Sequence, residues 1–123
     1  MINKLHPLTI TDNIKETSDF YKKYFGFEEV FTSEWYIQLA HKGGAEIAIM
    51  LPNLPNQPDF LHTPFAGKGI VFTFETEDAT TAYEELQSKG VSFTLKLKDE
   101  EWGQRHFILK DPSGTYVDVV QYL

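Results

Sequence analysis

The sequence predicts an α+β fold in which one βαβββ module occurs twice, with pseudo-twofold symmetry and with both sheets curling around a shared cleft. Three observations predict it. The 123 residues are 41% hydrophobic and 15% aromatic, so the chain can build a core without the disulfides that its lack of cysteine excludes. Strand-like and helix-like segments follow in the same order in each half. The offset that aligns Asn13 with Glu77 also aligns Gly26 with Gly90, where each predicted helix ends.

The first module, about residues 1–51, starts with a short strand at 8–10, where apolar and polar residues alternate. Asp12 and Asn13 are favourable N-caps for a helix over 14–24, whose apolar residues recur at helical spacing. Three strands are then expected at 27–32, 35–40 and 45–51, the last two joined by a glycine-containing hairpin turn at 41–44.

The segment 52–68 contains four prolines and is expected to link the modules, since proline cannot continue a central strand. The second module, 69–123, repeats the order. We expect a strand at 70–76, a helix capped by Asp78 and running to Lys89, and strands at 91–97, 103–110 and 115–122. Residues 1–123 are thus expected to form a single domain. An unrelated ferredoxin-like sandwich is the alternative, which eight strand-like segments disfavour.

The charge and the absence of long apolar runs restrict the class of protein. Eighteen acidic against eleven basic residues give a net charge of −7, which disfavours nucleic acid as a partner. No stretch approaches the roughly 20 apolar residues of a membrane span, and the first residues do not resemble a signal peptide. We therefore expect a soluble, cytoplasmic protein that does not interact with membranes.

Motifs near both ends of the chain resemble one family. Residues 12–14 with 20–27, DNI and FYKKYFGF, are similar to the opening motif of the glyoxalase, bleomycin-resistance and extradiol-dioxygenase group, the vicinal oxygen chelate superfamily. Residues 102–107, 111–114 and 117–119, read as WGQRHF, DPSG and VDV, resemble its closing motif. The resemblance covers essentially the whole chain. It implies the duplicated fold but no particular reaction, because this fold hosts lyases, isomerases, dioxygenases, thiol transferases and binding proteins.

Enzymes of this family typically hold a divalent metal with four His or Glu side chains from strands that line the cleft. The resemblance places Asp118 at the fourth ligand position and Val71 at the third, and the second falls on Ala48 or Met50. An alkyl side chain cannot bind a metal, so we expect the usual metal site to be absent and no cofactor to be needed.

A metal could still bind through other residues, and Zn, Ni, Mn or Fe would then be held by His6 and Asp118, with His106 as a relocated ligand. The first position falls on His6 or Leu5, depending on the alignment. His6 has the parity of Leu8 and Ile10, which are expected to face the helix, and this argues against it. Glu46 has the right parity for the second position but lies near the strand end.

Alternation along the strands predicts which side chains line the cleft. Tyr116, Asp118 and Val120 should share one face of the last strand, and His106 should share a face with Ile108. The predicted cleft residues are Trp35, Tyr36, Gln38, Met50, Val71, Thr73, Glu75, Trp102, His106, Tyr116 and Asp118. This mixture of aromatic and polar groups is typical of a small-molecule pocket.

Several of these residues have two interpretations. His106 and Asp118 are candidate catalytic residues, as an acid–base pair, but they could equally form a structural hydrogen bond or pair with Arg105. Trp35 and Trp102 could stack on a flat ligand or pack in the core. The run of alternating charges at 96–101 is expected to be a solvated surface.

Three functions follow from these residues. The first is a metal-independent protein resembling the bleomycin-resistance type, which binds or sequesters a small aromatic or cationic molecule of unknown identity. The second is a divalent-metal-dependent lyase, isomerase or dioxygenase of the glyoxalase type, and the third is a metal-free enzyme that uses His106 and Asp118. Because members of the family commonly dimerise, a homodimer is also expected.

Overall fold

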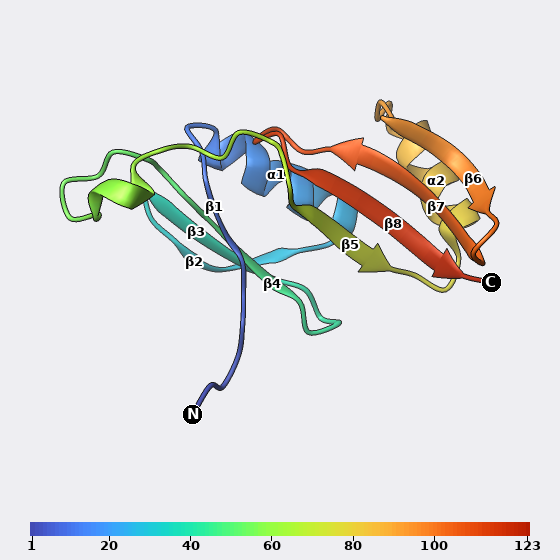
Figure 1. The fold of residues 1–123 in the computed structure, drawn as a ribbon, viewed down its shortest axis with the longest axis horizontal. Helices are drawn as coiled ribbons and strands as arrows, with labels where there is room; N and C mark the ends of the chain where they lie inside the picture. The colour runs from blue at the N-terminus through green and yellow to red at the C-terminus, as the bar shows by residue number, and fades with distance from the viewer. The chain divides into compact units, whose positions relative to one another are not determined.

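The computed structural model describes all of residues 1–123 and divides the chain into two compact units, 1–66 and 67–123 (Figure 1). Each unit contains one α-helix and one four-stranded sheet, in the order βαβββ. The predicted duplicated α+β architecture is therefore confirmed.

The first unit follows the predicted order of elements closely. Its sheet has the strand order β1-β4-β3-β2, with β1 parallel to β4 and the other pairs antiparallel. Helix α1 packs on β3 and β4. The elements are β1 (Leu8–Ile10), α1 (Ile14–Phe25), β2 (Glu28–Thr32), β3 (Tyr36–Ala40) and β4 (Glu46–Met50).

The core of this unit lies between α1 and the sheet. Tyr21 is almost fully buried and meets the ring of Phe27 edge-on, with centroids 5.7 Å apart. Leu39 and Ile49 are buried as well. Burial of each such side chain contributes roughly 1.5–3 kcal/mol to the free energy of unfolding. The packing of these side chains therefore fixes the helix on one face of the sheet. The helix ends at Gly26, whose φ of 73° is left-handed, as the sequence predicts.

The second unit repeats the topology with the strand order β5-β8-β7-β6, and β5 is parallel to β8. Asp78 caps the helix by accepting a 3.0 Å hydrogen bond from the backbone N–H of Thr81. Fully buried Phe107 contacts the rings of Tyr83 and Phe93, which lie 5.3 and 5.5 Å away between centroids. The elements are β5 (Val71–Glu75), α2 (Ala79–Ser88), β6 (Leu95–Glu100), β7 (Gln104–Lys110) and β8 (Tyr116–Tyr122).

One strand lies later in the chain than predicted. Instead of 91–97, β6 spans Leu95–Glu100, so the charged run expected to be a solvated surface is an edge strand. Its pairing with β7 outweighs the low strand propensity of lysine and acidic residues. The pairing contains a bulge between Leu95 and Lys98, which decides the arrangement of the site described below.

The proline-containing segment after β4 belongs to the first unit. The side chain of Gln57 accepts a hydrogen bond from the N–H of Leu54 and donates one to the carbonyl of Leu51. A short 3₁₀ helix, η1 (Asp59–Leu61), follows. The N–H of Phe65 donates to the carbonyl of Ile10 at 2.9 Å, which ties the end of this segment to β1. Neither α1 nor α2 is long and apolar enough to cross a membrane.

Candidate functional site

Each sheet has one face covered by its own helix and an opposite face, called here the open face. In the first unit Ile37 lies on the helix side, beside Ile14 of α1. Tyr36 and Gln38 therefore lie on the open face, where register pairs them with Met50 and Ala48. The predicted parity of Tyr36, Gln38 and Met50 is confirmed.

A chain of hydrogen bonds runs across this open face and ends at a carboxylate. The hydroxyl of Tyr36 donates to Oε1 of Gln38 at 2.9 Å, and Nε2 of Gln38 donates to Oε1 of Glu46 at 2.7 Å. The ammonium of Lys4 pairs with the other oxygen of Glu46. The hydrogen bonds from Lys4 and from Gln38 lower the pKa of Glu46, which keeps it negatively charged.

Aromatic rings lie next to Tyr36, at one end of this chain of hydrogen bonds. The ring of Tyr36 lies 6.0 Å from that of Phe31 and 5.8 Å from that of Trp35, between centroids. Phe31 is 56% exposed and Trp35 is 40% exposed, so Trp35 does not pack in the core. The open face thus combines exposed ring surface with a fixed negative charge, which are the two features that attract an organic cation.

On the open face of the second unit, one side chain from each of three neighbouring strands forms a triad. Nδ1 of His106, on β7, lies 2.8 Å from Oδ1 of Asp118 on β8. Nε2 of the same ring lies 3.0 Å from Oε2 of Glu100 on β6. His106 is only 6% exposed, and Lys98 pairs with the second oxygen of Glu100.

The two carboxylates favour the positively charged form of His106. Burial is the largest effect and lowers the pKa of His106, but the hydrogen bonds to Glu100 and Asp118 outweigh it and raise the pKa above 6.5. The pKa of Glu100 is lowered by the hydrogen bonds from His106 and Lys98. Each ring nitrogen faces a carboxylate oxygen, so neither is free to take a proton from a substrate, and this geometry favours a structural hydrogen-bond network over a general base.

Arg105 does not take part in the triad. Its Nε and Nη2 donate to the two carboxylate oxygens of Asp99 at 2.7 and 3.0 Å. Its Nη1 lies 3.5 Å from the hydroxyl of Thr80 on α2, which places Arg105 on the helix side of the sheet. Alternation along β7 explains why Arg105 and His106 point to opposite faces.

The remaining predicted residues of the second unit lie where parity places them. Register pairs Val71 with Tyr116 and Thr73 with Asp118, and Glu75 pairs with Val120. Trp102 precedes β7 and is 68% exposed, with its indole N–H donating to Oε1 of Gln104 at 2.8 Å.

The predicted orientation of β1 is wrong. Leu8 pairs with Ala48 and Ile10 with Met50, all on the open face, while Thr9 pairs with Ile49 on the helix side. Alternation of apolar and polar residues shows that β1 has two faces. It does not show which face lies on the helix side, and here that face carries Thr9 and not the apolar residues. The parity argument against His6 therefore no longer holds.

A sequence model of the Glyoxalase/Bleomycin resistance protein/Dioxygenase superfamily matches residues 4–119. The chain belongs to this superfamily. A search of curated proteins finds no match.

Several solved structures are similar to this chain along its whole length. A superfamily member from Sphaerobacter thermophilus DSM 20745 is 28% identical with a TM-score of 0.74, and the match covers 98% of each chain. A glyoxalase/bleomycin resistance protein/dioxygenase from Nocardioides is 17% identical with a TM-score of 0.81, covering 100% of this chain and 87% of the other. Virulence protein STM3117 from Salmonella typhimurium is 20% identical with a TM-score of 0.77, covering 100% and 99%. The last two show the fold alone.

The residues of this superfamily member do not fit the metal site that its family resemblance implies. The N–H of Thr11 donates to the carbonyl of Met50 in the first unit, as that of Thr76 donates to Val120 in the second. Met50 in the first module thus corresponds to Val120 in the second. Ala48, two residues before Met50, therefore corresponds to Asp118, two residues before Val120. A methyl group cannot replace a ligand oxygen, and the isopropyl group of Val71 cannot either. No three His, Asp or Glu side chains are arranged to hold a metal ion.

Sequence reasoning missed the contributions of Phe31, Glu100 and Lys4 to the open faces. Phe31 and Glu100 lie on the corresponding edge strands β2 and β6, and each follows a bulge in the pairing with the next strand. A bulge inserts one residue and reverses the alternation beyond it, so parity cannot be counted through it. Sequence provides no signal for Lys4, which lies before the first strand.

Proposed function

We propose that this chain is a metal-independent protein that binds a small molecule, and that its ligand is an organic cation with an aromatic or apolar part. The observation that carries the proposal is the open face of the first unit. There the charged carboxylate of Glu46, oriented by Gln38, lies on the same face as the exposed ring of Phe31 and the hydroxyl of Tyr36. A ligand cation would replace the ammonium of Lys4 at Glu46 and place its apolar part on the rings.

The family's metal chemistry receives little support from the residues present. Ala48 and Val71 stand at two of the four ligand positions implied by the resemblance, and Asp118 accepts a hydrogen bond from His106. Metal-free catalysis by His106 is also disfavoured, because both of its ring nitrogens are engaged by carboxylates. Binding without chemistry therefore agrees best with the side chains.

Metal content tests the first part of the proposal. Protein purified without chelator is expected to contain no stoichiometric metal, and its Tm is expected to stay constant when Zn²⁺, Ni²⁺ or Mn²⁺ is added. About one metal per chain, or a Tm rise of several degrees by linkage, would contradict a metal-independent function.

Matched ligands test the second part. Benzylammonium is expected to bind more tightly than benzyl alcohol, which has a similar shape but no charge, in calorimetric titrations at fixed ionic strength. Glu46→Gln should abolish this preference, whereas Glu84→Gln, an exposed acid on α2, should leave it unchanged. Equal affinity for the two compounds in the unmodified protein would refute the cation assignment.

A cytoplasmic homodimer also belongs to the proposal. It is supported by the family's common dimerisation and by the exposed side chains of Val30 and Ile70. Light scattering coupled to sizing chromatography is expected to give twice the mass of 14.2 kDa, and a monomer at high micromolar concentration would exclude the dimer.

A further inference from the structure

Two large aromatic side chains are exposed at one end of the second sheet. Strands β5, β6 and β8 end there and β7 begins there, because β5 is parallel to β8 and the other pairs are antiparallel (Figure 1). Trp102, in the turn before β7, is 68% exposed, and Tyr122, at the end of β8, is 59% exposed. Register pairs Gln104 with Tyr122, and the indole N–H of Trp102 donates to Oε1 of Gln104 at 2.8 Å. These three side chains, called here the aromatic end patch, therefore lie next to one another.

The turn that carries Trp102 is held in one conformation. Gly103 has a φ of 90°, a left-handed value that favours glycine, and its N–H donates to the carbonyl of Glu100 at 3.1 Å. The carbonyl of Gly103 accepts a 2.8 Å hydrogen bond from the N–H of Leu123, which ties the turn to the end of β8. The indole N–H is bonded to Gln104 as well. Trp102 is thus exposed but oriented, so a partner that contacts it loses little binding energy in ordering the ring.

Exposed carboxylates lie on both sides of the aromatic end patch. Glu101 precedes Trp102 in the turn that follows β6. On the other side, β5 pairs exposed Glu75 with Val120, two residues before Tyr122. The ion pairs of this unit use other acidic residues, namely Asp99, Glu100 and Asp118. Glu75 and Glu101 therefore leave a negative charge on each side of the rings.

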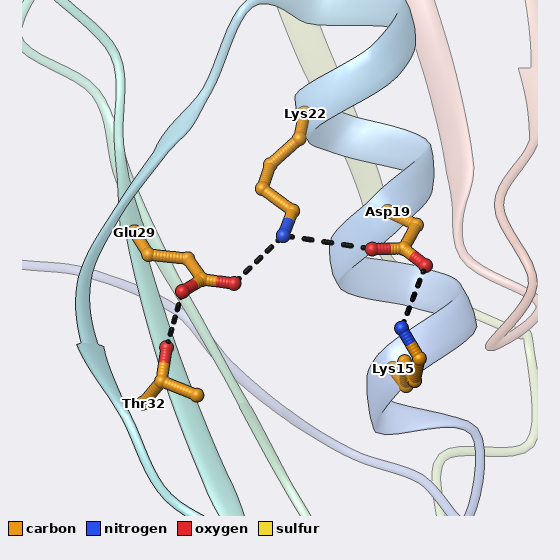
Figure 2. A network of polar contacts seen from close by, with 5 residues as sticks. All are labelled: Lys15, Asp19, Lys22, Glu29 and Thr32. Atoms are coloured by element: carbon orange, nitrogen blue, oxygen red, sulfur yellow. Dashed lines mark hydrogen bonds and ion pairs between the residues drawn. The ribbon is translucent and has the colours of Figure 1, made fainter.

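The first unit treats its surface carboxylates differently. Its edge strand β2 carries Glu29, whose Oε1 lies 2.7 Å from the ammonium of Lys22 (Figure 2). The same ammonium lies 3.5 Å from Oδ1 of Asp19, which also pairs with Lys15. The chain itself neutralises these carboxylates, whereas the two beside the aromatic end patch have no basic partner within the chain.

Charge complementarity decides which kind of partner suits this patch. Negative charges on both sides repel nucleic acid, anionic lipid and the same patch of a second copy. The rings attract apolar side chains and the alkyl stems of lysine and arginine, and their faces attract the cationic groups. Tryptophan and tyrosine are also the residues that most often carry the binding energy of protein interfaces. A basic protein segment with an apolar centre therefore matches both the rings and the charges.

We propose that the aromatic end patch is a docking site for an extended, basic segment of a protein partner. An apolar residue of the segment lies on Trp102 and Tyr122, and a basic residue on each side of it meets Glu75 or Glu101. Strands β5 and β6 are three strand spacings apart, about 14 Å, which an extended chain covers in about four residues. The basic residues of the partner are therefore expected four positions apart.

This docking site is independent of the function proposed above. It lies in the second unit and shares no residue with the first unit's open face, where Glu46 and Tyr36 carry that proposal. Loss of cation binding at Glu46 therefore leaves the docking site unaffected, and the reverse also holds.

The site is tested by NMR titration of the ¹⁵N-labelled protein with the peptide acetyl-KGLGK-amide. Saturable shifts are expected for the indole N–H of Trp102 and for the amides of Gln104 and Tyr122. Acetyl-KKLGG-amide has the same composition and charge but adjacent lysines, so it should bind more weakly, and acetyl-EGLGE-amide should not bind. Absence of saturable shifts at millimolar acetyl-KGLGK-amide would overturn the proposal, as would equal affinity for either of the other two peptides.

Variants separate the ring from the charges. Trp102→Ala should abolish the saturable shifts at Gln104 and Tyr122 while Tm stays unchanged, since the ring is mostly exposed. Glu75→Gln and Glu101→Gln should each lower the affinity for acetyl-KGLGK-amide about two- to fivefold, because each removes one exposed charge pair. Unchanged affinity in both of these variants would overturn the proposal.

Glu84→Gln is the matched control for the loss of one negative charge. Glu84 is an exposed acid on α2, which covers the helix side of the same sheet, so its replacement should leave the affinity for acetyl-KGLGK-amide unchanged. A fall as large as that of Glu101→Gln would show that net charge, and not the place of the carboxylates, determines binding, and would overturn the proposal.

Light scattering coupled to sizing chromatography distinguishes a separate partner from a second copy. Trp102→Ala is expected to have the same mass in solution as the unmodified protein. A lower mass for Trp102→Ala would show that a second copy of the chain covers the aromatic end patch, and would overturn the assignment of this patch to another protein.

Discussion

Nδ1 of His106 lies 2.8 Å from Oδ1 of Asp118, a contact between neighbouring strands of one sheet. In the β7–β8 register Asp118 faces Ile108 and His106 faces Val120, so the two side chains meet diagonally on the open face. Because Glu100 engages the other ring nitrogen, the contact belongs to a charged triad that links three strands. The stability of the second unit should therefore depend on the charge of this triad.

The triad predicts a specific pH dependence of stability. The pKa of His106 is raised above 6.5 in the folded chain, so its stabilising contribution is complete below pH 6.5 and is lost as pH rises through the raised pKa. The pKa of Glu100 is lowered from 4.5, so its contribution is present above pH 4.5 and is lost as pH falls through the lowered pKa. The loss in unfolding free energy caused by His106→Gln should thus be larger at pH 5.5 than at pH 8.5, measured by urea denaturation. A loss that does not vary with pH would contradict a charged triad.

Removing one carboxylate should lower the pKa of His106. Glu100→Gln replaces a charged acceptor with a neutral amide, so the imidazolium loses one of its two charge-assisted hydrogen bonds. NMR titration of the His106 ring protons is expected to show a lower pKa in this variant than in the unmodified protein. Glu101→Gln, at an exposed neighbour, is the matched control and should not move it.

Asp118→Ala should destabilise the chain by about 1–3 kcal/mol, because it leaves the Nδ1–H group of buried His106 without an acceptor. Asp118→Asn retains an acceptor oxygen, so it should lower the free energy of unfolding by less than Asp118→Ala does. Urea denaturation measures both. Equal losses would show that the negative charge, and not the hydrogen bond, carries the stabilisation.

Lys4→Ala should increase the affinity for benzylammonium about two- to fivefold, because it removes an exposed ammonium that competes for Glu46. The affinity is measured by calorimetric titration of Lys4→Ala with benzylammonium, and Glu46→Gln is titrated in parallel. Lys23→Ala, which removes a lysine that makes no contact with Glu46, controls for the change in net charge. A fall in affinity for Lys4→Ala would mean that Lys4 helps to hold the ligand.

Phe107→Ala should cost about 3–5 kcal/mol, as expected for a fully buried ring between two aromatic neighbours. Trp102→Ala should change stability by less than about 0.5 kcal/mol, since its ring is mostly exposed. A large loss for Trp102→Ala would show that this ring packs against something the monomer lacks, such as a second copy of the chain.

The repeated order of elements was accessible from sequence because its signals are local. Gly26 and Gly90 both adopt positive φ where they end the helices, and apolar periodicity separates helix from strand without any knowledge of tertiary contacts. The parity of His106 and Asp118 followed in the same way, because β7 and β8 pair without a bulge. Local patterns failed for β1, where threonine and not the apolar residues faces α1.

Sequence by itself therefore determined the duplicated module and the family, and it placed the second ligand position on Ala48 or Met50 and the third on Val71, none of which has a side chain typical of the family's metal ligands. Tertiary structure decided which carboxylate meets His106. Leu95 pairs with Ile108 and Lys98 pairs with His106, and these two β7 residues lie on the same face of the sheet. Because of the bulge between Leu95 and Lys98, Glu100 lies on the open face and contacts His106, whereas Asp99 lies on the helix side and pairs with Arg105. A bulge forms only when two strands pair, and neither strand alone specifies it, so the composition of the triad depends on the paired strands.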